Sequence, residues 1–134
     1  MMVERELPPR PLKIVYHRTK DIIRIIRPEK CNLVITMNIT PSVLRAICEP
    51  DCEVYFVSSS TNPNNLGYKS FPTTGSHYKL YRTPTRVIFS TANASLSSFN
   101  ELSFILPRSP DLDEFINQLK SDLVRQKEFL RAFH

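Results

Sequence analysis

The 134-residue sequence has little of several residue types, and each shortage narrows what the chain can be. It has no tryptophan and only two glycines, and it contains neither the G-x-G-x-x-G nor the G-x-x-x-x-G-K-[ST] phosphate loop. No apolar run approaches the roughly 20 residues of a transmembrane helix. The charged, proline-rich first residues have no signal-peptide core. We therefore expect a cytoplasmic protein with no membrane partner.

Cysteine is also scarce, and the count of three argues against a pure disulfide framework. Cys48 and Cys52 enclose a three-residue spacer, which fits half of a zinc site, a local disulfide or a pair of free thiols, with Cys31 left over. No second Cys/His pair lies nearby, and no paired-carboxylate metal site is visible. We expect the chain to use no metal and no cofactor.

What the chain does contain is positive charge on an ordinary globular composition. The formal net charge is +5, with 41% hydrophobic and 23% charged residues. That balance is typical of a folded domain and not of a disordered chain. Basic charge favours a polyanionic partner, most commonly nucleic acid; the alternative is a basic surface without a partner.

The first half of the chain alternates strands with short helices. Residues 1–12 are expected to form an extended arm, because three prolines exclude a helix there; residues 13–134 are expected to form one domain. Strands are predicted over residues 13–16, 32–37 and 53–57. Helices are predicted over residues 21–26, which Thr19 can cap, and 41–47, where proline takes the first turn. This alternation predicts an α/β fold with parallel crossovers.

The second half carries a loop, three strands and a helix. Residues 58–76 form a long polar loop, within which residues 66–71 favour a short strand. Loops of this length are often functional, so Tyr68 and Lys69 are candidates for substrate contact, with ordinary loop packing as the alternative. Strands are predicted over residues 77–82, 86–91 and 102–106. Pro110 begins a helix that is expected to run to about residue 133.

A polar set within residues 76–106 has a chemistry of its own. His77 and Lys79, two apart on a strand, would point to one face, where an imidazole beside an ammonium suits a phosphate. Asn93, after the next strand, adds an amide donor. Glu101 can accept a proton from one imidazole nitrogen and make the other a better nucleophile. The set indicates phosphodiester cleavage without a metal.

This order of residues resembles the phospholipase D superfamily, whose motif H-x-K-x4-D is followed by G-S-x-N and a later glutamate. The resemblance implies a mixed β-sheet flanked by helices on both faces. It implies that His77 is the nucleophile that forms a phosphohistidine, and that Lys79 and Asn93 hold the phosphate. Glu101 would orient the histidine, and Thr91 stands where the family has serine.

The chain also departs from the family pattern. Pro84 stands where the motif has aspartate, and Ser90 stands where G-S-x-N has glycine. We expect further substrate contacts from Ser95, Lys69 and Arg82. His17 and His134 have no partner in the motif, and we expect them at the surface.

Family enzymes use two copies of the motif, and this sequence has one. The resemblance therefore implies a homodimer with one composite active site. The expected activity is that of a phosphodiesterase, a nuclease acting on nucleic acid, with DNA preferred to RNA. The alternative is a catalytically inactive nucleic-acid-binding or assembly module, which the loss of aspartate at position 84 would fit.

Overall fold

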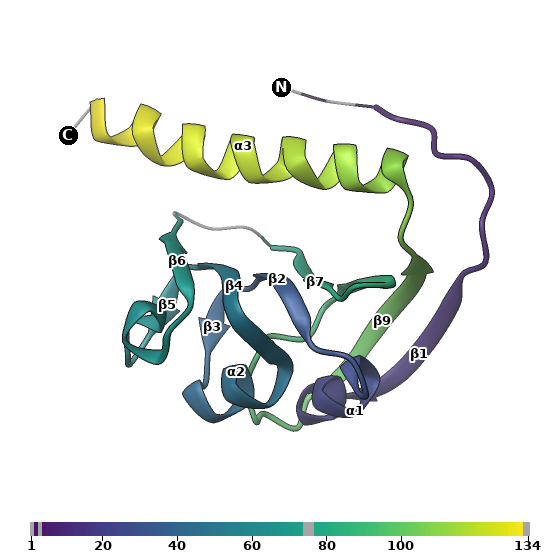
Figure 1. Ribbon diagram of the computed structural model, residues 1–134, viewed down its shortest axis with the longest axis horizontal. Helices are drawn as coiled ribbons and strands as arrows, with labels where there is room; N and C mark the ends of the chain where they lie inside the picture. Colours follow the sequence, from purple (N-terminus) through teal and green to yellow (C-terminus); the bar gives the residue numbers. More distant parts are fainter. Residues whose placement is uncertain (1, 3, 74–76, 133–134) are drawn as a thin grey trace.

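A mixed seven-stranded sheet forms the centre of the computed structural model, which describes residues 2, 4–73 and 77–132 (Figure 1). The strands are β1 (Lys13–Arg18), β2 (Cys31–Ile35), β4 (Cys48–Phe56), β6 (Lys69–Pro72), β7 (Lys79–Arg82), β8 (Arg86–Ser90) and β9 (Asn100–Pro107). Their order in the sheet is β1-β9-β8-β7-β2-β4-β6. The neighbouring strands in β1-β9-β8-β7-β2 pair antiparallel, and those in β2-β4-β6 pair parallel. Two further strands, β3 (Asn38–Ile39) and β5 (Ser58–Ser59), pair separately.

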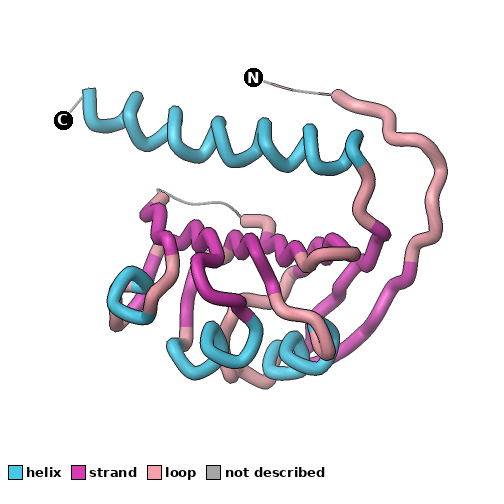
Figure 2. Tube along the Cα trace, in the orientation of Figure 1, coloured by secondary structure: helices cyan, strands magenta, loops and turns pink. Residues whose placement is uncertain are grey.

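Helices pack against both faces of this sheet (Figures 1 and 2). One core contains residues of α1 (Ile22–Ile26) and α2 (Pro41–Ile47) together with Val34, Val54 and Tyr81. The opposite core contains residues of α3 (Pro110–Ala132) together with Leu33, Tyr55 and Leu80. Neighbouring residues of a strand thus divide between the two cores, as the two-residue period of a strand requires. The predicted α/β class is confirmed.

Element boundaries follow the local signals where those signals are strong. The helix predicted over residues 41–47 is α2, without a change of boundary. The strand predicted over residues 53–57 is much longer, because β4 begins at Cys48, which pairs with Cys31 of β2. The described residues also contain two short 3-10 helices, η1 (Thr19–Asp21) and η2 (Pro63–Leu66). Residues 74–76 of the predicted loop, and residue 133 at the predicted helix end, lie outside the described residues.

The strand predicted over residues 77–82 needs a correction. β7 begins at Lys79, so His77 lies in a bend that precedes the strand. The alternation of strand side chains therefore does not fix the direction of the His77 ring. Lys79 is within the strand and shares its face with Tyr81.

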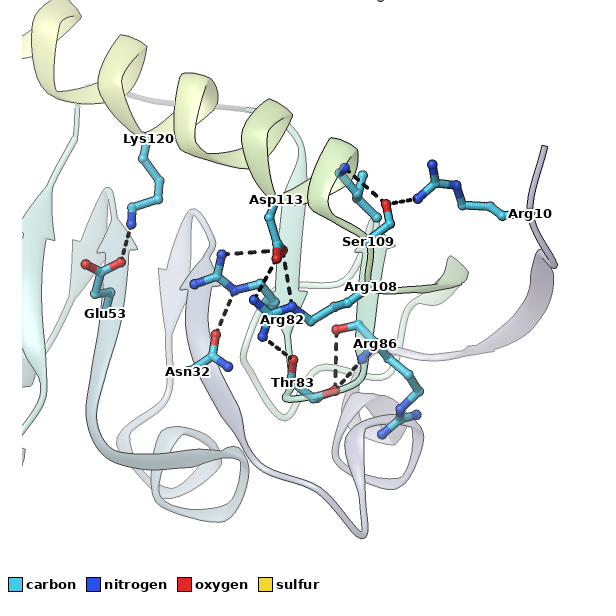
Figure 3. A network of polar contacts seen from close by, with 11 residues as sticks. Arg10, Asn32, Glu53, Arg82, Thr83, Arg86, Arg108, Ser109, Asp113 and Lys120 are labelled. Carbon is cyan, nitrogen blue, oxygen red and sulfur yellow. Dashed lines mark hydrogen bonds and ion pairs between the residues drawn. The ribbon is translucent and has the colours of Figure 1, made fainter. Parts of the chain in front are cut away.

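No helix or strand occurs in the described residues of the N-terminal arm, 2 and 4–12. Leu7 packs against the α3 side of the core. Arg5 forms an ion pair with Glu114 at 3.6 Å, and Arg10 donates a hydrogen bond to Ser109 (Figure 3). Among the described residues, no helix has the length and the apolar character needed to cross a bilayer.

The turn between β7 and β8 is held by one carboxylate from the loop after α1. Glu29 Oε1 accepts hydrogen bonds from the Thr83 and Thr85 hydroxyls at 2.9 and 2.8 Å and from Arg86 Nε at 2.9 Å. Arg86 also donates to the carbonyl oxygens of Ile25, at 2.8 Å, and of Ile26. The turn is therefore joined to the C-terminal end of α1. Partial burial acts to raise the pKa of Glu29, but the hydrogen bonds from Thr85, Arg86 and Thr83 outweigh it and lower that pKa.

We predict that Glu29→Gln lowers the free energy of unfolding at pH 7 by about 1–2 kcal/mol, because a charged acceptor shared by three donors is lost. A carboxylate whose pKa is lowered by folding stabilises above its unfolded pKa of about 4.3, and the contribution disappears as the pH falls through the folded pKa. The difference between Glu29→Gln and the unchanged protein should therefore shrink on acidification. Urea unfolding at pH 7 and at about pH 3.5 measures it.

Glu114→Gln is the matched control, because Glu114 is exposed and makes a single ion pair. It should cost less than about 0.5 kcal/mol at either pH. Equal effects of the two variants at pH 7 would contradict the role given to Glu29.

Candidate functional site

The register of three neighbouring strands brings the motif to one end of the sheet. Lys79 of β7 pairs with Ser90 of β8, and Ser90 pairs with Ser103 of β9. The strands are antiparallel, so this shared row lies at the start of β7, the end of β8 and the first half of β9. His77 precedes the row, and Thr91 and Glu101 lie on the same side of it. Because neighbouring strands are about 4.8 Å apart, β7 and β9 are about 10 Å apart here.

A hollow of about 300 Å³ lies at this end of the sheet. Its walls come from the loop after β8, the start of β9, β3 and η1. Four of the residues predicted from the sequence line it: Thr91, Asn93, Ser95 and Glu101. The remaining lining residues are Thr19, Asn38, Ser97 and Phe99. The hollow is thus lined by hydroxyls, two amides, one carboxylate and one aromatic ring, a set that can hydrogen-bond an oxyanion but supplies no cation of its own.

Asn93 joins the loop after β8 to the loop after β2. Its Oδ1 accepts hydrogen bonds from the Met37 and Asn38 backbone N–H groups at 3.1 and 3.3 Å and from the Thr36 hydroxyl at 3.1 Å. Its amide nitrogen makes no hydrogen bond with a described residue, and the side chain lines the hollow. The oxygen therefore has a structural role, while two N–H donors remain available to a ligand.

His77 and Lys79 lie beside the hollow and do not line it. The His77 side chain is exposed. Lys79 Nζ donates to the His77 carbonyl oxygen at 3.0 Å, which leaves two ammonium protons for other acceptors. No described residue forms a hydrogen bond with the Glu101 carboxylate, so the expected pair of Glu101 and His77 is not formed within this single chain.

His17 was expected at the surface, and that prediction is wrong. The ring is only 9% exposed, because β1 pairs with β9 and directs it toward Ser103. Nδ1 lies 2.6 Å from the Arg18 carbonyl oxygen, so it carries the proton in the neutral ring, and Nε2 accepts from Ser103 at 2.7 Å. Ser103 in turn contacts Ser90 at 2.8 Å. No local sequence signal marks this contact, because Ser103 lies 86 residues away from His17 in the chain. His134 lies outside the described residues.

The two departures from the family motif have clear local consequences. The Ser90 hydroxyl, at the family's glycine position, accepts a hydrogen bond from Ala92 N at 2.9 Å and so shapes the turn that leads to Asn93. Pro84, at the family's aspartate position, lies in the β7–β8 turn, to which Glu29 supplies a carboxylate from elsewhere in the chain. The Ser90 side chain is buried in a polar network, so it does not obstruct the hollow.

Two residues predicted to contact substrate lie away from the hollow. Arg82 lies on the α3 face of the sheet, where it donates to Asn32 at 2.7 Å and lies 3.9 Å from Asp113 (Figure 3). Burial, followed by the nearby charge of Arg108, lowers the pKa of Arg82. Lys69 lies on β6, at the far edge of the sheet. The geometry gives neither residue a contact at the hollow, and we leave both out of this site.

The three cysteines are free thiols buried in the core between the sheet and α1 and α2. Burial raises the pKa of the Cys31 thiol, and a hydrogen bond with Cys48 together with burial raises that of Cys52. The Cys31 and Cys52 thiols are therefore protonated at neutral pH. No cluster of three or more His, Cys, Asp and Glu side chains suited to a metal occurs among the residues that the structure describes.

Comparison with known proteins leaves the family of the chain unassigned. No protein-family model and no curated protein matches the sequence. A polyphosphate kinase from Porphyromonas gingivalis matches 84% of this chain and 26% of its own, with 12% identity and a TM-score of 0.48. TrmBL2, an archaeal chromatin protein whose structure shows a novel mode of DNA binding, matches 89% of this chain and 54% of its own, with 10% identity and a TM-score of 0.47. Scores below 0.5 at such identities assign neither a fold family nor a function.

The two roles of Asn93 can be separated by a pair of substitutions. Asn93→Ala should lower the free energy of unfolding by about 1–3 kcal/mol, because two backbone donors and a hydroxyl lose their acceptor. Asn93→Asp keeps the oxygen and should retain most of the stability. Urea unfolding of both variants measures this, with Asn65→Ala, an exposed asparagine in η2, as the control. Unchanged stability in Asn93→Ala would show that the oxygen is dispensable for the fold.

Proposed function

We propose that this protein is a metal-independent phosphodiesterase that cleaves nucleic acid, with His77 as its nucleophile. The observation that carries the proposal is the alignment of β7, β8 and β9, which gathers Lys79, Asn93 and Glu101 at the end of the sheet beside His77. The net charge of +5 supports a polyanionic substrate. The resemblance to the phospholipase D superfamily motif supports the same chemistry.

In the proposed reaction a His77 imidazole nitrogen attacks the phosphorus of the diester. A P–N bond forms and a P–O bond breaks, so the leaving alkoxide needs a proton. Lys79 Nζ and the free amide N–H groups of Asn93 stabilise the charge that develops on the non-bridging oxygens. Water then cleaves the P–N bond and releases a phosphate monoester together with the free imidazole.

A second copy of the chain supplies the general acid in this proposal. The leaving oxygen needs a proton from an imidazolium, and His17, the other histidine of the described residues, is buried and bonded to Ser103. Two His77 side chains facing each other across a twofold axis would serve as nucleophile and acid in one composite site. The exposure of His77 is compatible with such an approach.

A non-catalytic nucleic-acid-binding module is the second candidate, and one observation favours it. Asn93 uses its oxygen to hold two loops together, and Glu101 makes no hydrogen bond with His77 in the single chain. In this candidate the motif residues serve only folding and phosphate binding. This candidate predicts binding without turnover.

Hydrolysis of labelled DNA and RNA in EDTA distinguishes the two candidates. We predict turnover that EDTA leaves unchanged, because imidazole groups replace the metal. His77→Ala should abolish turnover, and Lys79→Ala and Asn93→Asp should each lower kcat by about 10²-fold through lost charge stabilisation. Lys20→Ala removes an exposed lysine outside the motif and should leave the rate unchanged. If wild type and His77→Ala are both inactive but both still bind nucleic acid, the protein is a binding module.

An equimolar mixture of wild type and His77→Ala tests the composite site in the same assay. If both histidines are needed, only wild-type pairs are active, and the rate should fall to about a quarter of that of the wild type. A rate of about one half would show that each chain works alone.

A further inference from the structure

A groove of about 610 Å³ lies on the face of the sheet opposite the candidate site, between β4, β6 and α3. The α3 residues that line it lie in the middle of the helix, and β6 is the edge strand of the sheet (Figure 1). The volume falls within the range of small-molecule sites. The side chains that line it are Glu53, Tyr55, Phe71, Asn117, Lys120, Ser121, Val124 and Arg125.

Two stacked aromatic rings form the floor of this groove at the sheet edge. Tyr55 of β4 is paired in register with Phe71 of β6, and their ring centroids lie 4.7 Å apart at an interplanar angle of 15°. The stack runs across the strands, and β6 is the last strand of the sheet. No further strand therefore supplies a side chain beyond Phe71, which is only partly buried. A planar ring placed there would continue the stack.

The Tyr55 hydroxyl is a polar group without a partner inside the groove. The residue is only 3% exposed, and its hydroxyl forms no hydrogen bond with a described residue. No fully buried side-chain nitrogen or oxygen atom lacks a partner within the described part of the chain, so this oxygen is open to the groove that Tyr55 lines. Burial, followed by the charge of Glu53, raises the pKa of Tyr55 to about 12, so the group is a protonated donor at neutral pH.

The rim of the groove carries positive charge. Glu53 and Lys120 neutralise each other through a 2.7 Å ion pair between β4 and α3 (Figure 3). The Arg125 side chain is 72% exposed. Its ion pair with Asp122 is long, at 4.0 Å, and lies at the surface, so it contributes little. Lys69 is exposed and shares the α3 face of β6 with Phe71, two residues away. Two cations therefore flank the ring stack.

We propose that this groove binds an unpaired base of single-stranded nucleic acid. The base continues the Tyr55–Phe71 stack on the outer face of Phe71, and Lys69 and Arg125 contact the flanking phosphates. A duplex does not fit, because its bases already stack on one another; aromatic stacking with cations is how proteins hold single strands. The inference rests on the proposed function for its choice of nucleic acid, but it concerns a second contact on the opposite face of the sheet.

Fluorescence anisotropy with two labelled single strands of equal length tests this groove. One strand carries bases, and the other carries abasic tetrahydrofuran residues with the same phosphate charge. All proteins carry His77→Ala, so that the strands stay intact. We expect the base-carrying strand to bind more tightly, and Phe71→Leu to weaken it about tenfold by removing one stacked base without changing abasic binding. Tyr16→Leu, an exposed tyrosine on the opposite edge strand β1, is the matched control and should change neither.

Tyr55→Phe keeps the stack and removes only a hydroxyl that Phe71 separates from the base, so it should leave the binding of both strands unchanged. Quenching of a 2-aminopurine base by the His77→Ala protein keeps the test valid if Phe71→Leu fails to fold. If the two strands bind equally tightly, or if Phe71→Leu weakens the binding of both strands equally, the groove does not bind a base. Neither result would bear on hydrolysis at His77. A mononucleotide that binds as tightly as the strand would also overturn the proposal for this groove, in favour of a free nucleotide.

Discussion

The register of β7 between β2 and β8 is the constraint on which the candidate site depends. β7 joins the antiparallel half of the sheet to its parallel half, pairing Leu80 with Ile35 on one side and with Phe89 on the other. A slip of one residue would exchange the two faces of the strand. It would turn Lys79 toward the apolar core beneath α3 and bring Leu80 to the side of the polar hollow. Burial of Leu80 and Tyr81 against opposite layers therefore fixes the face of the sheet on which Lys79 lies. The Glu29 carboxylate reinforces that register from the turn at the other end of the strand.

The two faces of the sheet divide the proposed work between chemistry and strand binding. The face toward α1 and α2 ends in the polar hollow, which Asn93 lines. The Asn93 side-chain oxygen accepts hydrogen bonds from within the protein, so its amide N–H groups are the donors left for a ligand. These hydrogen bonds hold the amide group in place before a ligand binds, and such preorganisation is what electrostatic catalysis requires. The face toward α3 carries the groove with the stacked rings and the Tyr55 hydroxyl. Lys69 was expected among the substrate contacts of the motif; it lies on the same face of β6 as Phe71, beside this groove.

Local signals predicted the helices well and the long-range contacts poorly. Thr40 and Pro41 fix the start of α2 through backbone geometry alone, so its boundaries needed no tertiary knowledge. The true length of β4 depends on the pairing of Cys48 with Cys31, and the burial of His17 depends on Ser103; both partners are distant in sequence. Four predicted residues do share one hollow, because strand ends that follow one another in an antiparallel meander meet in space. Arg82 lies away from the hollow, because strand alternation turns it to the α3 face, where Asn32 and Asp113 contact it.

The central claim is that His77 forms a covalent bond to phosphorus, and trapping that bond tests it most directly. Single-turnover reaction with a diester that carries ³²P at the scissile phosphate, quenched in alkaline detergent, should label the protein. The label should be stable to base and released by acid, as expected of a phosphoramidate P–N bond, and peptide mapping should place it on His77. Lys79→Ala should lower the rate of labelling, and His77→Ala should abolish it. Steady turnover by the wild type with no trapped label, or label that persists in His77→Ala, would contradict the account.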